Sequence, residues 1–342
     1  MNAEDGIHEI ADRAAPVLRA AGVSSPFRLE RLTGGGNNRV YRVDSAGAPV
    51  VLKLYFRHAA DPRDRLRADF GYSSFAWNVG VRALPKPLAS DHEAGMAAYE
   101  HVQGRKLAPG ALTRSRVAEA ADFFRLVNEH REHPHAIDLP EASEACFSVA
   151  SHVACVDLRV KRLSTIAVDS PLGREAADLV ACLLGPTWRR VSQRVRASQR
   201  NSTDRPLAAS ERCLSPSDFG FHNAMVATDG RLRFLDFEYS GWDDPAKMVC
   251  DFFCQPAVPV SRNELDFFVG RIGEVGSMNE VFSRRVDLLL PVYELKWCCI
   301  MLNEFLAVGE SRRSFAGIPE NRELHLAHQL ESVRRALGCI EA

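Results

Sequence analysis

Apolar and polar residues alternate from Phe27 onward, a pattern that predicts β-strands with one buried face. The segments FRLERL and VYRV are joined through a glycine-rich tip, and PVVLKLYF follows after a short turn, so three strands form a meander. Residues 1–26 have the apolar spacing of a short amphipathic helix, and residues 61–80 repeat that spacing before the strand MAAYEHV. One helix against a small antiparallel sheet predicts a compact lobe over residues 27–104.

Helical periodicity dominates the chain after Leu112. Two short apolar runs, AMVA and LRFLDF, flank a Thr-Asp-Gly turn and predict a β-hairpin within this region. We expect long helices at 116–131, 144–163 and 173–199, and more helices from Asn263 to the end. The predicted fold class is therefore α+β with two lobes: an N-terminal helix (1–26), a small antiparallel-sheet lobe (27–104) and a larger, mainly helical lobe (105–342).

Composition is that of an ordinary soluble globular protein, with 46% hydrophobic and 25% charged residues in a chain of 342. The formal net charge of -1 gives no reason to expect nucleic acid or an anionic membrane as a partner. The N-terminus lacks the apolar core of a signal peptide, and no apolar run is long enough to span a bilayer. The nine cysteines lack zinc-type spacing. These features predict a cytoplasmic protein with free thiols and leave its oligomeric state open.

The glycine-rich tip is the first candidate for chemistry. It consists of Gly34, Gly35, Gly36, Asn37 and Asn38, and it lies between two predicted strands. A dinucleotide-binding turn and a Walker P-loop both need a helix behind the glycines, so this position excludes them. Glycines between strands let backbone amides close over phosphate groups, because no Cβ is in the way. Taken alone, an ordinary hairpin turn explains the tip better.

Lys53 lies in the apolar strand VVLKLY, directly after the glycine hairpin. A lysine with apolar neighbours on both sides either extends its amine to solvent at an edge or holds an anion in a cleft. The preceding glycine hairpin favours the second interpretation, because a phosphate-binding cation is wanted at that place.

The strongest pattern is SDFGFHN, in which Asn223 follows Asp218 by five residues, and Asp236 stands beyond the predicted hairpin. One carboxylate can face a substrate hydroxyl, while a second carboxylate and a carboxamide oxygen bind the hard cation that neutralises nucleotide phosphates. Asp and Asn also stabilise turns, which is the structural alternative for each residue taken alone. Their order behind a glycine tip and a strand lysine favours a shared site.

Together these segments resemble the aminoglycoside phosphotransferase family, which is related to choline and fructosamine kinases and has a protein-kinase-like fold. The segments LTGGGNNRVYRV, VVLKLY, AYEHVQG, SDFGFHN and FLDFEYSGWDDPA carry the resemblance over residues 27–255. The resemblance implies ATP and Mg²⁺ as cofactors and a small-molecule hydroxyl as the acceptor. It further implies the following roles: Asp218 as catalytic base, Asn223 and Asp236 as magnesium ligands, Lys53 on the phosphates, and the backbone of Glu100 and Val102 on adenine.

The sequence departs from the family pattern at two places. Pro216 replaces the His that usually stands two residues before the catalytic Asp, and this change questions the rigidity of the loop. The helix after Lys53 usually offers a Glu to the lysine, and by distance from Gly80 we expect Asp69 in that position. Pro216 also supports an alternative, a catalytically silent nucleotide-binding scaffold. A protein kinase is a second alternative, although Glu238 stands where protein kinases have Gly and no Ala-Pro-Glu-like motif follows.

The acceptor cannot be read from these motifs, and we expect a sugar, an amino-sugar or a similar metabolite. The segment YELKWCCIMLNEF is apolar enough to be a core helix. Its polar residues Glu294, Asn303 and Glu304 are candidates to face a cationic amino-sugar if that helix borders the cleft.

Overall fold

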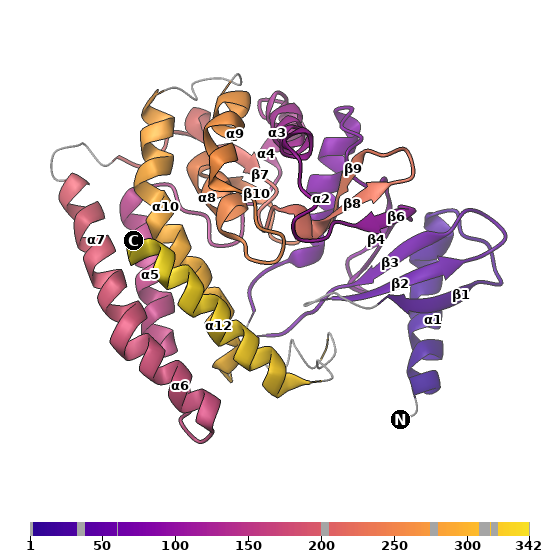
Figure 1. Cartoon of the computed structure of the whole chain (residues 1–342). Coiled ribbons are helices and arrows are strands. Elements are labelled where there is room, and N and C mark those ends of the chain that lie inside the picture. Colours follow the sequence, from indigo (N-terminus) through magenta and orange to yellow (C-terminus); the bar gives the residue numbers. More distant parts are fainter. Residues whose placement is uncertain are drawn as a thin grey trace.

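The computed structural model describes residues 3–32, 38–59, 61–199, 205–273, 280–307, 315 and 321–341. It has two lobes, a small one built on an antiparallel sheet and a larger one built mainly of helices (Figure 1). The expected α+β architecture with two lobes is confirmed. None of the helices in the described ranges combines the length and the apolar character needed to cross a membrane.

The N-terminal lobe contains a five-stranded sheet in the order β1-β2-β3-β5-β4, in which every neighbouring pair is antiparallel. The meander predicted from alternation supplies the first three strands. The strands are β1 (Arg28–Leu32), β2 (Arg39–Asp44), β3 (Val50–Leu54), β4 (Pro87–Asp91) and β5 (Met96–Glu100).

Two helices cover this sheet, α1 (Ala3–Ala20) and α2 (Arg65–Asn78). Successive side chains of a strand point to opposite faces, so Leu52 and Lys53 of β3 face different helices. Leu52 belongs to the core that the sheet shares with α1, which includes Leu18. On the other face, Leu66 of α2 packs with the buried aromatic rings of Tyr55 and Tyr99. Lys53 is therefore directed toward α2, the helix in which we expected its acidic partner.

The C-terminal lobe surrounds one large hydrophobic core. Its helices are α3 (Arg114–Asn128), α4 (Pro134–Ile137), α5 (Val149–Leu163), α6 (Pro171–Leu179), α7 (Gly185–Gln199), α8 (Pro245–Cys254), α9 (Leu265–Ile272), α10 (Glu280–Leu302) and α12 (Arg322–Glu341). Short 3-10 helices lie at Ala209–Glu211, Phe221–Asn223, Arg262–Glu264 and Asn303–Phe305. Its strands are β6 (Gly104–Lys106), β7 (Cys213–Ser215), β8 (Ala224–Ala227), β9 (Leu232–Phe234) and β10 (Gly241–Asp243).

The strands of this lobe form two small sheets that position the loops between them. β8 and β9 form the predicted hairpin, and β6 pairs with β8 on its other side. β7 and β10 pair antiparallel, so the end of β7 at Ser215 lies opposite the start of β10 at Gly241. The residues after Ser215 and the residues before Gly241 therefore leave this pair at the same end.

Two predicted helices differ in extent from the observed ones. The helix expected over 144–163 begins only at Val149, because Ser148 and Ser151 cap its start reciprocally. The helix expected over 173–199 is split by one π-helical turn, Val180–Leu184, between α6 and α7.

Candidate active site

The glycine tip is described only at its end. Gly34, Gly35, Gly36 and Asn37 lie outside the described residues, so their contact with phosphates stays a prediction. The side chain of Asn38 is buried and makes two hydrogen bonds. Its Nδ2 donates to Glu238 Oε2 at 2.7 Å, and its Oδ1 accepts from the backbone N–H of Phe56 at 3.3 Å. The carboxamide therefore joins the base of the tip to the loop after Asp236.

Lys53 forms a bridge between two carboxylates from different lobes. Its Nζ lies 2.5 Å from Asp69 Oδ2 on α2 and 2.7 Å from Asp236 Oδ1 in the C-terminal lobe. Asp69 is almost fully buried and also accepts hydrogen bonds from the Tyr55 hydroxyl and the Phe237 backbone N–H, at 2.8 and 3.2 Å. The pairing of Lys53 with Asp69, which we expected from the family pattern and the distance to Gly80, is present.

The charge of Lys53 is set by this environment. Burial lowers the pKa of Lys53, but the carboxylates of Asp236 and Asp69 outweigh burial and hold it well above the usual lysine value. The side chain is therefore a permanent cation at the junction of the lobes. Such a group is suited to bind the phosphates of a nucleotide.

Other residues hold the loop that carries Asp218, in place of the His that the family usually has there. The backbone of Leu214, in β7, donates to the side chain of Asn128 and accepts from it, at 2.8 and 3.0 Å. Ser215 Oγ accepts from the Ser217 N–H at 3.1 Å, across the buried Pro216. Ser217 and Asp218 both have positive φ, 46° and 42°, a conformation that costs non-glycine residues free energy and is concentrated at functional sites. Pro216 therefore lies in a braced loop.

Asn223 and Asp236 leave the same end of the β8–β9 hairpin. Asn223 Nδ2 lies 3.0 Å from the carbonyl oxygen of Asp218 and 3.3 Å from its Oδ2, and the Leu235 N–H donates to the Asn223 carbonyl at 2.8 Å. Asp236 follows Leu235 directly and has a φ of 68°. About a third of each acidic side chain is exposed, 34% for Asp218 and 35% for Asp236. The predicted base and the predicted metal ligands thus come together within reach of solvent.

One buried aromatic ring packs against the residues that directly follow Asp218 and Asp236. The ring of Phe123, on α3, lies 5.7 Å from that of Phe219 and 5.8 Å from that of Phe237. These two rings directly follow Asp218 and Asp236 in the chain. Aromatic contacts of this kind contribute beyond the area that they bury, so the shared ring stabilises the relative position of the two loops.

The donor set suits Mg²⁺, a hard cation that prefers oxygen ligands. Asp236 offers a half-exposed carboxylate and Asn223 a carboxamide oxygen. Within the described part of the chain, no three His, Cys, Asp or Glu side chains form a ready-made metal site. A magnesium ion would therefore need phosphate oxygens to complete its shell, as is usual for nucleotide-dependent enzymes.

Three residues that the sequence reasoning missed also belong to the site. His222 Nε2 lies 3.4 Å from Asp218 Oδ1, and a Cβ at Gly220 would come within 2.8 Å of His222 Nδ1. Glu238, behind Asp236, is paired with the buried Arg65 at 3.0 Å. Burial and the Asp236 carboxylate raise the pKa of Glu238, while Arg65 opposes them. The spacing of His222 from Asp218 is a signal that could have been used, whereas the Arg65–Glu238 pair joins distant segments and leaves none.

The link between the lobes contains Glu100 and Val102, whose backbones we expect to meet adenine. The Glu100 N–H already donates to the Lys86 carbonyl at 2.8 Å, so this residue can offer only its carbonyl oxygen to a ligand. The Val102 N–H donates to no other residue of the described ranges. Their role toward adenine remains a prediction.

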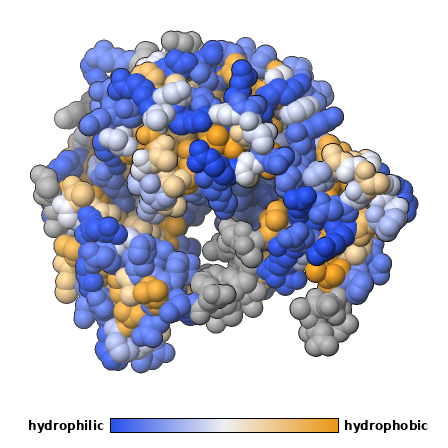
Figure 2. Space-filling model, turned by 45° about the vertical axis from the view of Figure 1, so that its right-hand side comes forward, coloured by the Kyte–Doolittle hydropathy of each residue, from blue (hydrophilic) through white to orange (hydrophobic). Residues whose placement is uncertain are grey.

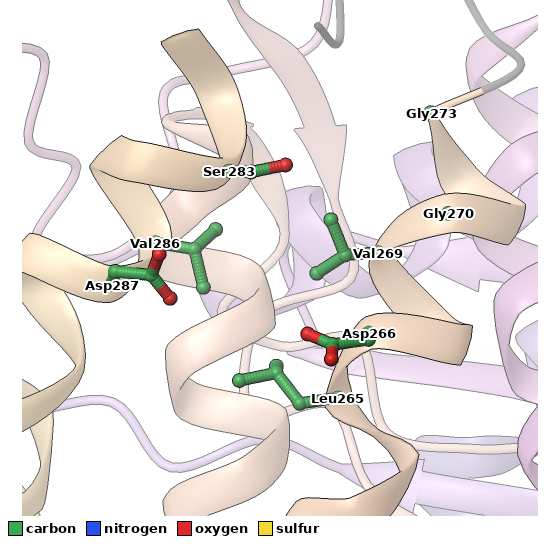
Figure 3. A pocket seen from close by; sticks show the side chains of 8 residues that line it. All are labelled: Leu265, Asp266, Val269, Gly270, Gly273, Ser283, Val286 and Asp287. Carbon is green, nitrogen blue, oxygen red and sulfur yellow. The ribbon is translucent and has the colours of Figure 1, made fainter. Parts of the chain in front are cut away.

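Two cavities border the C-terminal lobe. The larger one, about 1210 Å³, lies beside the site between the β3–α2 connection and the end of α5, and Figure 2 shows the surface hollowed between the lobes. The smaller one, about 420 Å³, lies between α9 and α10, where Asp266 and Asp287 line it together with valine side chains (Figure 3). No predicted site residue lines the smaller cavity.

Two of the polar residues expected to face the acceptor, Glu294 and Asn303, are placed differently from one another. Glu294 of α10 is paired with Arg262 at 2.6 Å and lines neither cavity, whereas Asn303 lines the larger one. Whether Glu294 faces a cationic substrate therefore stays a prediction, and its pairing with Arg262 does not favour it.

Comparison with solved structures shows the same fold in several kinases. The chain is similar to spectinomycin phosphotransferase in complex with ADP and spectinomycin, with a TM-score of 0.63, 12% identity, and 100% and 98% of the two chains covered. It is similar to choline kinase LicA from Streptococcus pneumoniae, with a TM-score of 0.60, 13% identity, and 98% and 99% covered. A choline/ethanolamine kinase family protein from Mesorhizobium loti has a TM-score of 0.57 and 20% identity, with 96% and 99% covered.

None of the curated proteins compared with the chain matches its sequence. A family model described as the phosphotransferase enzyme family matches residues 28–266, a range that includes Lys53, Asp218 and Asp236. This match confirms the resemblance drawn from the motifs. The chain belongs to the phosphotransferase enzyme family and is a small-molecule kinase.

Proposed function

We propose that the protein transfers the γ-phosphate of ATP to a hydroxyl group of a small metabolite, with Asp218 as the catalytic base. The observation that carries this proposal is the bridge of Lys53 to Asp236, next to the contact of Asn223 with Asp218. A cation for phosphates, oxygen ligands for a metal and a separate carboxylate for the acceptor are the parts that phosphoryl transfer requires.

Lys53 binds the α- and β-phosphates, and Asp69 holds its amine in place. Asp236 and Asn223 are the residues that would hold Mg²⁺, which neutralises charge on the phosphates when bound. The backbone of Glu100 and Val102 orients adenine, and the glycine tip 34–37 closes over the phosphates. These contacts mainly position the nucleotide, because a loose phosphoryl-transfer transition state needs orientation and charge neutralisation more than covalent help.

Asp218 acts on the acceptor. Its Oδ1 or Oδ2 accepts the hydroxyl proton while the hydroxyl oxygen bonds to the γ-phosphorus, and the bond from that phosphorus to the bridging oxygen breaks to leave ADP. The hydrogen bond from Asn223 Nδ2 to Asp218 Oδ2 fixes the orientation of the carboxylate, as does the His222 ring beside Asp218 Oδ1. A silent scaffold would have no use for this braced loop and its strained backbone.

A screen of hydroxylated metabolites with Mg-ATP tests the proposal. The expected result is a product heavier by one phosphoryl group, formed together with ADP, from a sugar or sugar-like metabolite. The Asp218→Asn variant serves as the control for phosphorylation by contaminating kinases. ADP formation at equal rates by the wild type and this variant would overturn the proposal.

A further inference from the structure

The larger cavity adjoins the site along several segments that carry the proposed nucleotide-binding residues. Phe56 lines it three residues after Lys53, Ala68 directly before Asp69, and Glu238 two residues after Asp236. Tyr239 and Ser240 complete this wall, and Gly241 follows them at the start of β10.

The register of β7 and β10 connects the cavity to the catalytic loop. Ser215 pairs with Gly241, so the loop that leads to Asp218 and the wall segment 238–240 leave the two strands at the same end. Asp218 does not itself line the cavity, so an acceptor bound there would have to extend a hydroxyl from the cavity to this carboxylate. Its remaining groups would meet the cavity wall.

The carboxylates of this wall are largely neutralised by arginines of the chain itself. Asp61 pairs with Arg63 and Arg65, at 2.6 and 2.9 Å, and Glu238 also pairs with Arg65. Glu144 pairs with Arg159. A cationic acceptor would have to compete with these guanidinium groups for each carboxylate.

Two more carboxylates belong to the lining. Asp64 Oδ1 caps the start of α2 by accepting from the Arg67 N–H at 2.9 Å, so this carboxylate already has a hydrogen-bond partner. Glu141 is 66% exposed at the rim, where water screens its charge, and Arg212 Nη1 lies 3.9 Å away.

The aromatic rings that line the cavity already contact other side chains of the protein. Recognition of a quaternary ammonium group needs open aromatic faces. The Tyr239 ring has the guanidinium groups of Arg63 and Arg65 over it, 5.5 and 5.0 Å from the centroid. The Phe56 ring stacks on His58 at 6.1 Å and meets the edge of Phe315 at 5.5 Å. An aromatic cage for a choline-like head group is therefore not available on this wall.

Two arginines of the lining have no carboxylate partner among the described residues, namely Arg67 and Arg162. The only hydrogen bond that the Arg67 guanidinium makes within the described ranges is to the Asp138 carbonyl, at 3.5 Å. Arg162 lies three residues after Arg159 at the end of α5, so both project from the same side of that helix. An arginine without an internal carboxylate is suited to bind a carboxylate or phosphate of a ligand.

We propose that the acceptor of this kinase is an alcohol that carries a carboxylate or phosphate group, which Arg67 and Arg162 bind. This inference rests on the proposed function, because it assigns the substrate class of the same site. It differs from what the names of the similar solved kinases would suggest, since choline, ethanolamine and spectinomycin carry cationic nitrogen groups.

The test compares alcohols of similar size that differ in charge. The first set contains glycerate, glycerol and choline, and the second gluconate, glucose, glucosamine and a hexose monophosphate. Phosphorylated product is measured by mass with Mg-ATP at constant ionic strength. We expect the anionic members of a set to react at least about tenfold faster than the neutral and cationic members. The hexose monophosphate and gluconate arms distinguish a phosphate from a carboxylate requirement.

Variants of the two arginines test where the anionic group of the acceptor binds. Arg162→Ala and Arg67→Ala should each raise the KM for the anionic acceptor about tenfold and leave the KM for ATP unchanged. Arg174→Ala is the matched control, since this exposed arginine of α6 bonds only to the Val168 carbonyl among the described residues and lies outside the cavity. The Arg174→Ala variant should change neither the KM for the acceptor nor the KM for ATP.

The outcomes separate this inference from the function on which it rests. Fastest turnover of a cationic alcohol such as choline or glucosamine would overturn the anionic acceptor and leave the kinase assignment intact. The same holds if the two arginine variants behave like Arg174→Ala with an anionic acceptor. If no member of either set is phosphorylated and the Asp218→Asn variant hydrolyses ATP like the wild type, the proposed function falls and the acceptor class with it.

Discussion

Replacing Asp69 by Asn tests the electrostatic centre of the site. The substitution keeps the size of the side chain and removes its negative charge, while Lys53 keeps Asp236 as its partner at 2.7 Å. Without the charge of Asp69, the ammonium group is attracted mainly to Asp236, the proposed metal ligand, and is drawn away from its place on the phosphates. We therefore expect weaker binding of Mg-ATP in a protein that is still folded.

The size of the effect follows from the contacts that change. The Lys53–Asp69 contact is a charge-assisted hydrogen bond between buried groups, with 2% of the Asp69 side chain exposed. Such a bond contributes about 1.5–3 kcal/mol. Since about 1.4 kcal/mol corresponds to a factor of ten, the Kd for Mg-ATP should rise about tenfold to a hundredfold.

Isothermal titration calorimetry of Mg-ATP measures this change without knowledge of the acceptor. Tyr55→Phe is the control, because it removes the 2.8 Å hydrogen bond to Asp69 and leaves both charges in place. The substitution leaves the Lys53–Asp69 pair in place, so the Kd for Mg-ATP should change by less than about fivefold. Wild-type affinity in the Asp69→Asn protein, with a native circular dichroism spectrum, would refute the role given to this pair.

Three further substitutions probe other parts of the account. Asp236→Asn should raise the Mg²⁺ concentration for half-maximal activity at least about tenfold, and an unchanged magnesium titration would speak against its metal role. Phe123→Ala should lower the free energy of unfolding by about 3–5 kcal/mol in urea titrations, and a wild-type midpoint would show that the ring does not support the loops. Burial raises the pKa of Glu144, but Arg159 more than offsets it and lowers that pKa from 4.5 to about 2. The pair therefore stabilises the fold above pH 4.5, and this contribution is lost as the pH falls toward 2. Because 43% of the Glu144 side chain is exposed, Glu144→Gln should lower stability at pH 7 by only about 1 kcal/mol, a difference that vanishes in acid. A difference that grows in acid would contradict the assignment.

Much of the site could be predicted because its signals are local. The meander, the hairpin and the order of Lys53, Asp218, Asn223 and Asp236 are all visible in short segments of the sequence. Asp69 could be placed because a helix with a defined end at Gly80 fixes which residue faces the sheet. A site residue could be predicted wherever one short segment shows both its secondary structure and its functional side chain.

Contacts between distant segments could not be predicted in this way. β6 pairs with β8 and β7 with β10, in strands of three or four residues that are too short to show a periodicity. The buried Arg65–Glu238 pair joins the two lobes, and neither residue indicates the other in the sequence. The large cavity arises from such contacts, so the charge of its wall became visible only in three dimensions.

The most direct test of the central claim is the rate of product formation by Asp218→Asn at a nucleotide concentration that saturates both proteins. With any acceptor that the wild type phosphorylates, the account predicts a loss of at least about a hundredfold, while the Kd for Mg-ATP stays within about fivefold of the wild type. Product formation at a rate near that of the wild type would contradict the assignment of Asp218 as the base.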